Sequence, residues 1–291
     1  MLLISEKKKL TQRISELKKN GRKINFIPTM GNLHEGHISL IRAAKNKNFI
    51  CLVSIYVNPH QFDNKKDFFS YPRTFSMDKR LLIRENIDLL FAPKNEFLNK
   101  KLNIPPLGAI VKRLCGIDRP GHFEGVAKVI INFLDIIQPD YIYLGEKDFQ
   151  QILVIKKIIK ALKINTVVIA MPTVRDIKDV AISSRNQFLK NKKNELRKIP
   201  DTLNKIRTRI LKGNFKISTI EDLKKDLLEN GINNVNYLEI LKEDNLSKIN
   251  KQFNDCRIFI SVNIDGIKLI DNKSLGSRLK LIGEKVVVEN R

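Results

Sequence analysis

The feature that most constrains the fold is a continuous apolar run from Ile50 to Val57, interrupted only by Ser54. A strand with one face in water alternates apolar and polar residues, whereas a strand buried on both faces stays apolar. A second apolar run, Ile24 to Pro28, precedes it, and apolar residues at helical spacing lie between the two at 38–44. Strand, helix and strand in this order predict a βαβ unit, and therefore parallel pairing with a right-handed crossover.

The same alternation continues along the chain. A helical pattern at 5–20 opens it, and helical patterns at 76–86, 125–137 and 148–162 precede apolar runs at 87–93, 141–145 and 165–172. This order predicts an α/β fold with a doubly wound, Rossmann-like parallel sheet. In such sheets ligands bind beyond the carboxyl ends of the strands, so the residues that follow each strand are the first candidates for a site.

The pattern changes after about residue 175. Two charged helical stretches are followed by three short apolar runs, and this order is typical of a smaller α+β domain. The predicted helices are 191–212 and 218–230, and the predicted strands are 235–241, 257–264 and 267–272. No linker rich in Pro, Gly or Ser marks the boundary, so we expect one domain over 1–175 and a second over 176–291.

Composition excludes few classes of function. The 54 Lys and Arg minus 31 Asp and Glu give a net charge of +23. Such a charge attracts nucleic acid or small anions, but here lysines are spread over the whole chain. We favour compositional drift with an anion site within it and expect no nucleic-acid partner; a basic RNA-binding protein is the alternative.

Cysteine content and hydropathy predict where the protein works. The three cysteines, Cys51, Cys115 and Cys256, are far apart and form no CxxC pair, as expected in a reducing compartment. No apolar stretch reaches the roughly 18 residues of a membrane span, and the run that opens the chain is too short for a signal peptide. We therefore expect a cytoplasmic protein that has no membrane partner.

The stretch PTMGNLHEGHISL, Pro28 to Leu40, carries the most chemistry. Gly31 and Gly36 have the spacing of a P-loop, yet His37 replaces the P-loop lysine and Ile38 the hydroxyl residue. A helix N-terminus attracts phosphate, and imidazoles can bind phosphate oxygens and change protonation near neutral pH. His34 and His37 lie on one face of the expected helix. A metal pair or plain helix capping remain alternatives from this segment alone.

Two further loops support the phosphate interpretation. GEKD, residues 145–148, follows an expected strand and supplies Lys147 and Asp148. ISSRN, residues 182–186, supplies two hydroxyls and Arg185, whose guanidinium can form paired hydrogen bonds with phosphate oxygens. We expect these groups at the same edge of the sheet as His34 and His37, where their shared ligand would be a nucleotide phosphate chain.

Several ordered blocks resemble one family. They are PTMGNLHEGH, VSIYVNPHQF, YPRT (71–74), RPGHFEG (119–125), QPDYIYLGEKDFQQ (138–151), SSRN and LIDN (269–272). In order and spacing, over about residues 1–275, they are similar to the pantoate–β-alanine ligases, also called pantothenate synthetases. This family belongs to the nucleotidyltransferase superfamily with the HxGH motif.

The resemblance implies a reaction. Proteins of this family condense (R)-pantoate with β-alanine using ATP and Mg²⁺, release AMP and pyrophosphate, and pass through pantoyl adenylate. It also implies a homodimer, with 1–175 binding nucleotide and pantoate and 176–291 closing over the ATP site. An enzyme that adenylates another acid is the alternative within the superfamily.

The resemblance also implies roles for individual residues. His37 would be the proton donor, His34 would lie beside the phosphates, Lys147 would neutralise charge near the phosphorus, and Arg185 would close over the triphosphate. Gln61 would bind pantoate and β-alanine in turn and Gln151 would bind pantoate, with Asn58 a weaker candidate for that pocket. The residues implied for ATP are Met30, Gly31, Asn32, Leu33, His34, Glu35, Gly36, His37, Gly145, Glu146, Lys147, Asp148, Val174, Ile182, Ser183, Ser184 and Arg185.

Three points stay open in the sequence. The family usually carries Asp-Gly before the serine motif, whereas this chain has Lys178 and Asp179; a turn that needs a positive φ would tolerate an aspartate better than most residues. His122, with Arg119, could line an anionic pocket or pin a loop. The resemblance predicts no magnesium ligands, and it assigns nothing to residues 278–291.

Overall fold

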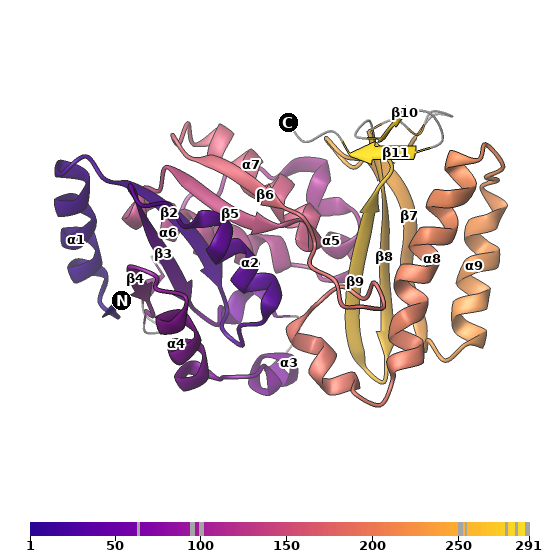
Figure 1. Cartoon of the computed structure of the whole chain (residues 1–291), viewed down its shortest axis with the longest axis horizontal. Helices are drawn as coiled ribbons and strands as arrows, with labels where there is room; N and C mark the ends of the chain where they lie inside the picture. The colour runs from indigo at the N-terminus through magenta and orange to yellow at the C-terminus, as the bar shows by residue number, and fades with distance from the viewer. Residues whose placement is uncertain are drawn as a thin grey trace. The chain divides into compact units, whose positions relative to one another are not determined.

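The computed structural model describes residues 1–62, 65–93, 97–98, 102–249, 253, 255–276, 279–282 and 285–288. Contacts divide the chain into two compact units. The first unit comprises Met1–Arg175 and Ile182–Ser184, and the second comprises Asp176–Ala181 and Arg185–Arg291. Figure 1 shows the elements of each unit.

The first unit is built on a six-stranded sheet in the order β1-β4-β3-β2-β5-β6, and all of its strand pairs are parallel. The strands are β1 (Leu2–Ile4), β2 (Lys23–Thr29), β3 (Phe49–Ile55), β4 (Leu89–Phe91), β5 (Tyr141–Gly145) and β6 (Val167–Met171). The α-helices are α1 (Lys7–Lys19), α2 (Glu35–Ala44), α3 (Lys65–Ser70), α4 (Phe75–Arg84), α5 (Cys115–Asp118), α6 (His122–Ile137) and α7 (Phe149–Ala161). Short 3₁₀ helices are η1 (Pro59–Gln61), η3 (Gly108–Lys112) and η4 (Glu146–Asp148). The predicted doubly wound sheet is confirmed.

Successive residues of the central strands pack into different layers. In β2, Phe26 belongs to the apolar cluster that includes Phe133 of α6, with ring centroids 5.2 Å apart, whereas Ile27 belongs to the cluster that includes Ile41 of α2. Because both faces are covered, β3 is buried from Ile50 to Ser54. This explains why its sequence lacks polar alternation.

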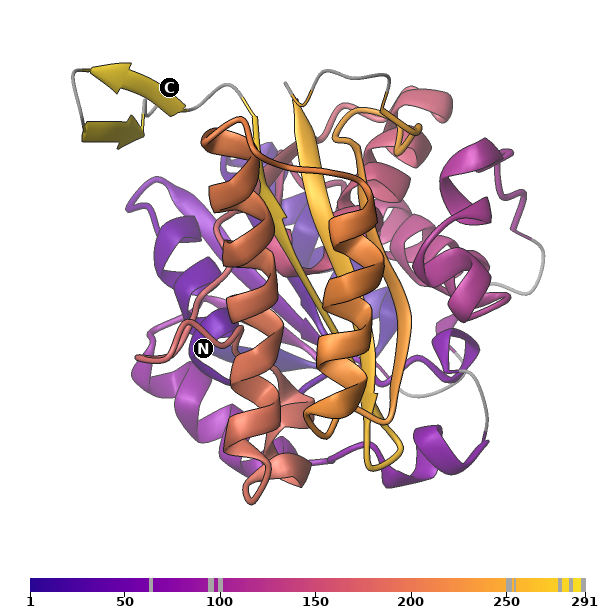
Figure 2. The same ribbon diagram turned by 90° about the vertical axis from the view of Figure 1, so that its right-hand side faces the viewer.

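The second unit is an antiparallel sheet in the order β7-β8-β9, with α8 and α9 packed against it. Its elements are α8 (Lys193–Leu211), α9 (Ser218–Glu229), β7 (Asn234–Lys242), β8 (Cys256–Ile264) and β9 (Ile267–Ser274), and η5 (Ser184–Leu189) begins where the chain enters it. Figure 2 shows α8 and α9 side by side over the sheet. A hairpin of β10 (Leu279–Ile282) and β11 (Lys285–Val288) follows, in a stretch for which the sequence made no assignment. The predicted smaller α+β fold is confirmed.

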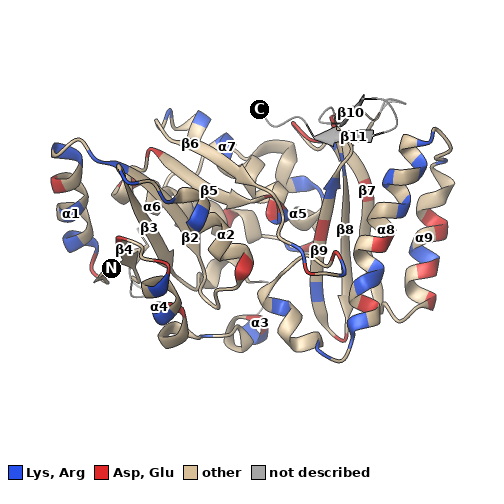
Figure 3. Ribbon diagram, in the orientation of Figure 1, with Lys and Arg blue, Asp and Glu red and all other residues tan. Residues whose placement is uncertain are grey.

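Basic residues are spread over helices, strands and loops of both units, as Figure 3 shows. They occur along α1 and α8 as well as on the strands, and acidic residues lie among them on α9. This distribution supports compositional drift as the main origin of the net charge.

Candidate active site

The loop between β2 and α2, residues 30–34, is called the glycine loop here, and it lies at the carboxyl edge of the parallel sheet. Gly31 and Asn32 have φ angles of 79° and 50°, so the chain turns sharply before α2 begins at Glu35. Thr29 stabilises this turn: its hydroxyl donates to the carbonyl of Ser54 at 2.7 Å and accepts the N–H of Gly31 at 3.2 Å. The loop is thereby tied to the end of β3.

Asp78 of α4 is a loop contact that the sequence reasoning did not find. Its side chain is buried, with 3% exposure. One carboxylate oxygen accepts the N–H of Leu33 at 2.9 Å, and the other accepts the N–H of Asn32 at 3.0 Å and the hydroxyl of Thr74 at 3.1 Å. The available signal was the YPRT block, which ends at Thr74, four residues before this carboxylate.

The two histidines of the motif meet at the start of α2. Their ring centroids lie 4.1 Å apart, with 36° between the ring planes. Nδ1 of His37 accepts the backbone N–H of His34 at 3.3 Å. A neutral imidazole carries one proton, so this hydrogen bond places the proton of His37 on Nε2, which is then a donor.

The surroundings of both histidines disfavour their charged forms. Burial, and then Lys147, lower the pKa of His34 to about 4, while Asp148 acts in the opposite direction. Desolvation lowers the pKa of His37 to about 3, and His34 and Lys147 contribute in the same direction. Both imidazoles are therefore neutral at pH 7 in the absence of an anionic ligand.

Lys147 and Asp148 lie in η4, which follows β5, the neighbour of β2 in the sheet. The Nζ of Lys147 is 3.6 Å from a carboxylate oxygen of Asp148. Both residues act on the pKa of His34, so the structure brings the GEKD loop and the glycine loop together as predicted. Glu35, in contrast, is exposed and pairs with Arg42 at 2.8 Å.

The serine motif, ISSRN at 182–186, contacts the glycine loop through Ser184. The hydroxyl of Ser184 donates to the carbonyl of Asn32 at 3.2 Å, and the N–H of Ile182 donates to the carbonyl of Val174 at 3.0 Å. Arg185 belongs to the second unit, where its guanidinium donates to the carbonyl of Lys268 at 3.0 Å. The predicted approach of Arg185 to the phosphates stays a prediction.

A second polar cluster surrounds Gln61, at the end of η1. Its amide nitrogen lies 2.7 Å from the sulfur of Met30, and its amide oxygen accepts from the side chain of Asn58 at 3.1 Å. Asn58 is buried and also donates to the carbonyl of Gly125 at 2.9 Å. Three residues predicted for the site, Met30, Asn58 and Gln61, therefore meet.

His122 and Arg119 hold the main chain of Gln61. Nδ1 of His122 lies 2.8 Å from the Gln61 carbonyl oxygen, and the guanidinium of Arg119 donates to the same oxygen at 3.2 Å. These contacts favour the loop-pinning role that the sequence left open. A Cβ added at Gly125 would lie 2.1 Å from the carbonyl oxygen of His60, so α6 and η1 approach closely at that point.

The neighbouring glutamines of α7 differ. Gln150 is buried and bonds to main-chain groups: it accepts from the N–H of Cys115 at 3.0 Å and donates to two carbonyls of the η3–α5 segment, at 2.7 and 2.8 Å. Gln151, predicted for pantoate, is partly exposed at the start of the same helix. Gln150 is therefore a structural residue.

Comparison with known proteins decides the family. The model of the family described as pantoate-beta-alanine ligase matches residues 2–274. This chain belongs to the pantoate–β-alanine ligase family. The resemblance found in the sequence is thereby confirmed.

Two relatives named pantothenate synthetase are more than a third identical to the chain over the aligned residues. The pantothenate synthetase of Thermosipho melanesiensis is 38% identical over 259 residues, which cover 88% of this chain and 92% of that protein. The pantothenate synthetase of Acinetobacter baumannii is 39% identical over 253 residues, which cover 86% of this chain and 89% of that protein.

Solved structures of family members have the same fold. The crystal structure of pantothenate synthetase from Thermus thermophilus superposes with a TM-score of 0.87 at 29% identity, covering 95% of this chain and all of that one. The pantoate-beta-alanine ligase of Francisella tularensis, complexed with beta-gamma ATP and beta-alanine, gives a TM-score of 0.76 at 36% identity, covering 94% of this chain and 98% of that one.

The described residues carry neither a clustered metal site nor a membrane-spanning helix. Within that part of the chain, no group of three or more His, Cys, Asp or Glu side chains could hold a metal ion. Among the same residues, no helix is long and apolar enough to cross a bilayer.

Proposed function

We propose that this chain condenses (R)-pantoate with β-alanine at the expense of ATP, releasing AMP and pyrophosphate and giving pantothenate through a pantoyl-adenylate intermediate. One observation carries the proposal: two neutral imidazoles and the Lys147 ammonium share one edge of the sheet with the Gln61 cluster. The first group suits a triphosphate, and the second offers neutral amide donors and acceptors to the hydroxyl and carboxylate oxygens of a small polar acid.

The chemistry explains why a carboxylate substrate must first be adenylated. A carboxylate is inert to amines, so its oxygen first attacks the α-phosphorus of ATP, and pyrophosphate leaves. The β-alanine nitrogen then attacks the carbonyl carbon of the mixed anhydride, and AMP leaves with the electron pair. Negative charge accumulates on the phosphates in the first step, and Lys147 together with the Nε2–H of His37 would stabilise it.

Gln61 suits a substrate pocket that changes occupants. Its amide can both donate and accept without adding charge, as a hydroxy acid and then an amine require. Asn58 fixes its orientation through the amide oxygen, and His122 and Arg119 fix its main chain. We assign Gln61, Asn58 and Gln151 to the pantoate pocket, with Gln61 also binding β-alanine.

Magnesium would arrive with ATP. Mg²⁺ keeps several waters and is usually bound through phosphate oxygens plus one or two carboxylates, so it needs no cage of protein ligands. Asp148 fits this mode, because its half-exposed carboxylate lies beside Lys147 and acts on His34. We assign it as a carboxylate available to the metal near the phosphates.

The second unit would complete the ATP site. We assign Arg185 to the triphosphate, because its guanidinium follows Ser184, which bonds to the glycine loop. We also infer a cytoplasmic homodimer. The three buried cysteine thiols agree with a reducing compartment, and the edge strand β6, with Val167 51% exposed, offers an apolar surface to a second copy.

The reaction can be tested directly with purified protein. AMP should form only when pantoate, β-alanine, ATP and Mg²⁺ are all present, and formation of ADP would exclude the adenylate route. Exchange of pyrophosphate into ATP with a panel of hydroxy acids separates pantoate from other acids. An RNA-binding protein on this scaffold would instead show no AMP formation and an RNA affinity that falls steeply with salt.

A further inference from the structure

The backbone N–H groups of the glycine loop are occupied by the protein itself. In a P-loop, successive main-chain N–H groups point at the phosphates and hold them. Here the N–H of Gly31 donates to Thr29, and the N–H groups of Asn32 and Leu33 donate to Asp78. Three successive donors therefore point into the protein, although the glycine spacing imitates a phosphate-binding loop.

We propose that Asp78 is a positioning residue of the ATP site: it holds the glycine loop so that side chains, rather than loop amides, meet the phosphates. The proposal rests on the proposed function. Asp78 itself would touch neither ATP nor pantoate, since both of its oxygens are engaged by the loop and by Thr74.

The local geometry shows how the carboxylate shapes the loop. Asn32 has a positive φ of 50°, a conformation that its N–H bond to Asp78 stabilises. A Cβ added at Gly31 would lie 3.1 Å from the Asp78 carboxylate and 3.2 Å from the side chain of Ile55. The carboxylate therefore lies directly against the loop, and at a φ of 79° glycine fits there best.

The loop is held from two sides. Asp78 binds the N–H of Asn32, and the hydroxyl of Ser184 binds the carbonyl of the same residue. The buried carboxylate is satisfied by three donors, and its negative charge repels phosphate from its side of the loop. Phosphates are thereby directed to the start of α2, where His34 and His37 lie near Lys147.

Asp78→Asn tests the proposal with little change of shape. The side-chain amide of the new asparagine can accept only through its oxygen. Its nitrogen would therefore face the backbone N–H of Asn32 or of Leu33, and that hydrogen bond would be lost. We expect the Kd for ATP, measured by calorimetry without pantoate, to rise about 10- to 100-fold, as loss of a charge-assisted bond predicts. The affinity for pantoate alone should not change.

Asp140→Asn is the matched control. Asp140 also accepts a backbone N–H from β2, that of Ile24 at 2.8 Å, but at the opposite end of the strand. This variant should lose stability yet bind ATP like the wild type. Equal weakening of ATP binding by both substitutions would mean a general loss of stability and would overturn the proposal, as would unchanged ATP affinity in Asp78→Asn.

Thr74→Val provides a milder variant that keeps the carboxylate and both loop bonds. It should weaken ATP binding less than Asp78→Asn and should add nothing in an Asp78→Asn background, because Thr74 acts through the carboxylate. If Asp78→Asn does not fold, an unchanged affinity for ATP in Thr74→Val is by itself enough to overturn the proposal. A wild-type protein that forms no AMP would refute the proposed function, while these ATP affinities would still decide the role of Asp78.

Discussion

The backbone N–H of His34 donates to Nδ1 of His37, and the two imidazole rings lie 4.1 Å apart. This pairing holds two titratable rings at the start of α2, where burial disfavours the charged form of each. In the free protein their pKa values are lowered to about 4 and about 3, so both imidazoles are mainly neutral at pH 6 and above.

Binding of ATP should therefore take up protons. The negative phosphates favour imidazolium, so they raise both pKa values from their lowered positions, and protons bind wherever the new pKa values exceed the pH. Calorimetric titrations at pH 6, in two buffers with different ionisation heats, should show uptake in the wild type. ATP itself exchanges protons, so the comparison with His37→Gln isolates the imidazole; equal proton counts in the two proteins would contradict this prediction.

Substitutions of His37 distinguish hydrogen bonding from proton transfer. His37→Ala removes the Nε2–H donor and should lower kcat by about 10²- to 10³-fold, with a much smaller change in the Kd for ATP, if the bond strengthens in the transition state. His37→Gln places an amide N–H near the position of Nε2–H. Partial recovery of AMP formation in His37→Gln would indicate a neutral donor, whereas turnover as low as that of His37→Ala would indicate that proton transfer is essential.

The sequence predicted the fold well where the signal is local. The run at 50–57 appears as β3, because a strand buried on both faces is apolar throughout. The run at 141–145 appears as β5, in which buried and partly exposed residues alternate. The edge strand Leu2–Ile4 was missed: it has only three residues and exists through pairing with β4, far along the chain. The α6 helix begins at His122 rather than 125, and Phe123 in its first turn is buried at helical spacing with Val126 and Ala127.

The site was predicted less evenly. His34, His37 and Lys147 come together because the carboxyl ends of parallel strands lie at one edge of the sheet. The alternation of strands and helices along the sequence is enough to predict this. Asp78 could not be found in this way. Asp78 contacts a loop that lies 46 residues earlier in the chain, and this contact depends on how α4 packs. An aspartate in a charged helical stretch does not by itself predict such a contact.

Gly125→Ala should disturb the pantoate pocket without weakening its helix. Alanine favours a helix by about 1 kcal/mol over glycine. Its Cβ, however, would lie 2.1 Å from the carbonyl oxygen of His60, so η1 and Gln61 must move, at a cost of about 1–3 kcal/mol. We expect a higher KM for pantoate and an unchanged Kd for ATP. Glu124→Ala, on the exposed side of the same helix, is the control and should change neither constant; an unchanged KM in Gly125→Ala would show that η1 does not depend on this contact.

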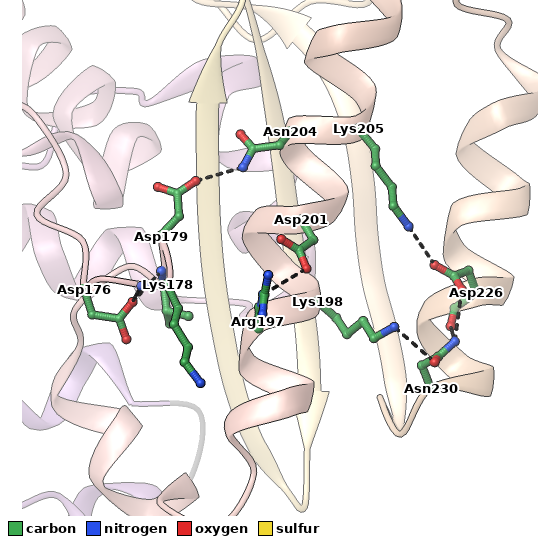
Figure 4. A network of polar contacts seen from close by, with 11 residues as sticks. Asp176, Lys178, Asp179, Arg197, Lys198, Asp201, Asn204, Lys205, Asp226 and Asn230 are labelled. Atoms are coloured by element: carbon green, nitrogen blue, oxygen red, sulfur yellow. Dashed lines mark hydrogen bonds and ion pairs between the residues drawn. The ribbon is translucent and has the colours of Figure 1, made fainter.

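Asp179, at a position where the sequence resemblance implies a glycine, has a φ of 65°. Its carboxylate accepts from the side chain of Asn204 at 2.9 Å, as Figure 4 shows, and from Lys273 at 3.2 Å. Asp179→Ala keeps the unfavourable φ and loses both contacts, so it should lower the free energy of unfolding by about 1–2 kcal/mol. Asp179→Gly loses the contacts but relieves the φ, so it should cost less.

Urea denaturation of the two variants compares these effects, with Asp201→Ala as a control. Asp201 pairs with Arg197 at 3.5 Å on the exposed side of α8, and loss of such a pair costs at most about 0.5 kcal/mol. A larger loss of stability in Asp179→Gly than in Asp179→Ala would mean that backbone freedom, rather than the left-handed conformation, dominates at this turn. The aspartate would then stabilise the segment that leads into the second unit chiefly by restricting the unfolded chain.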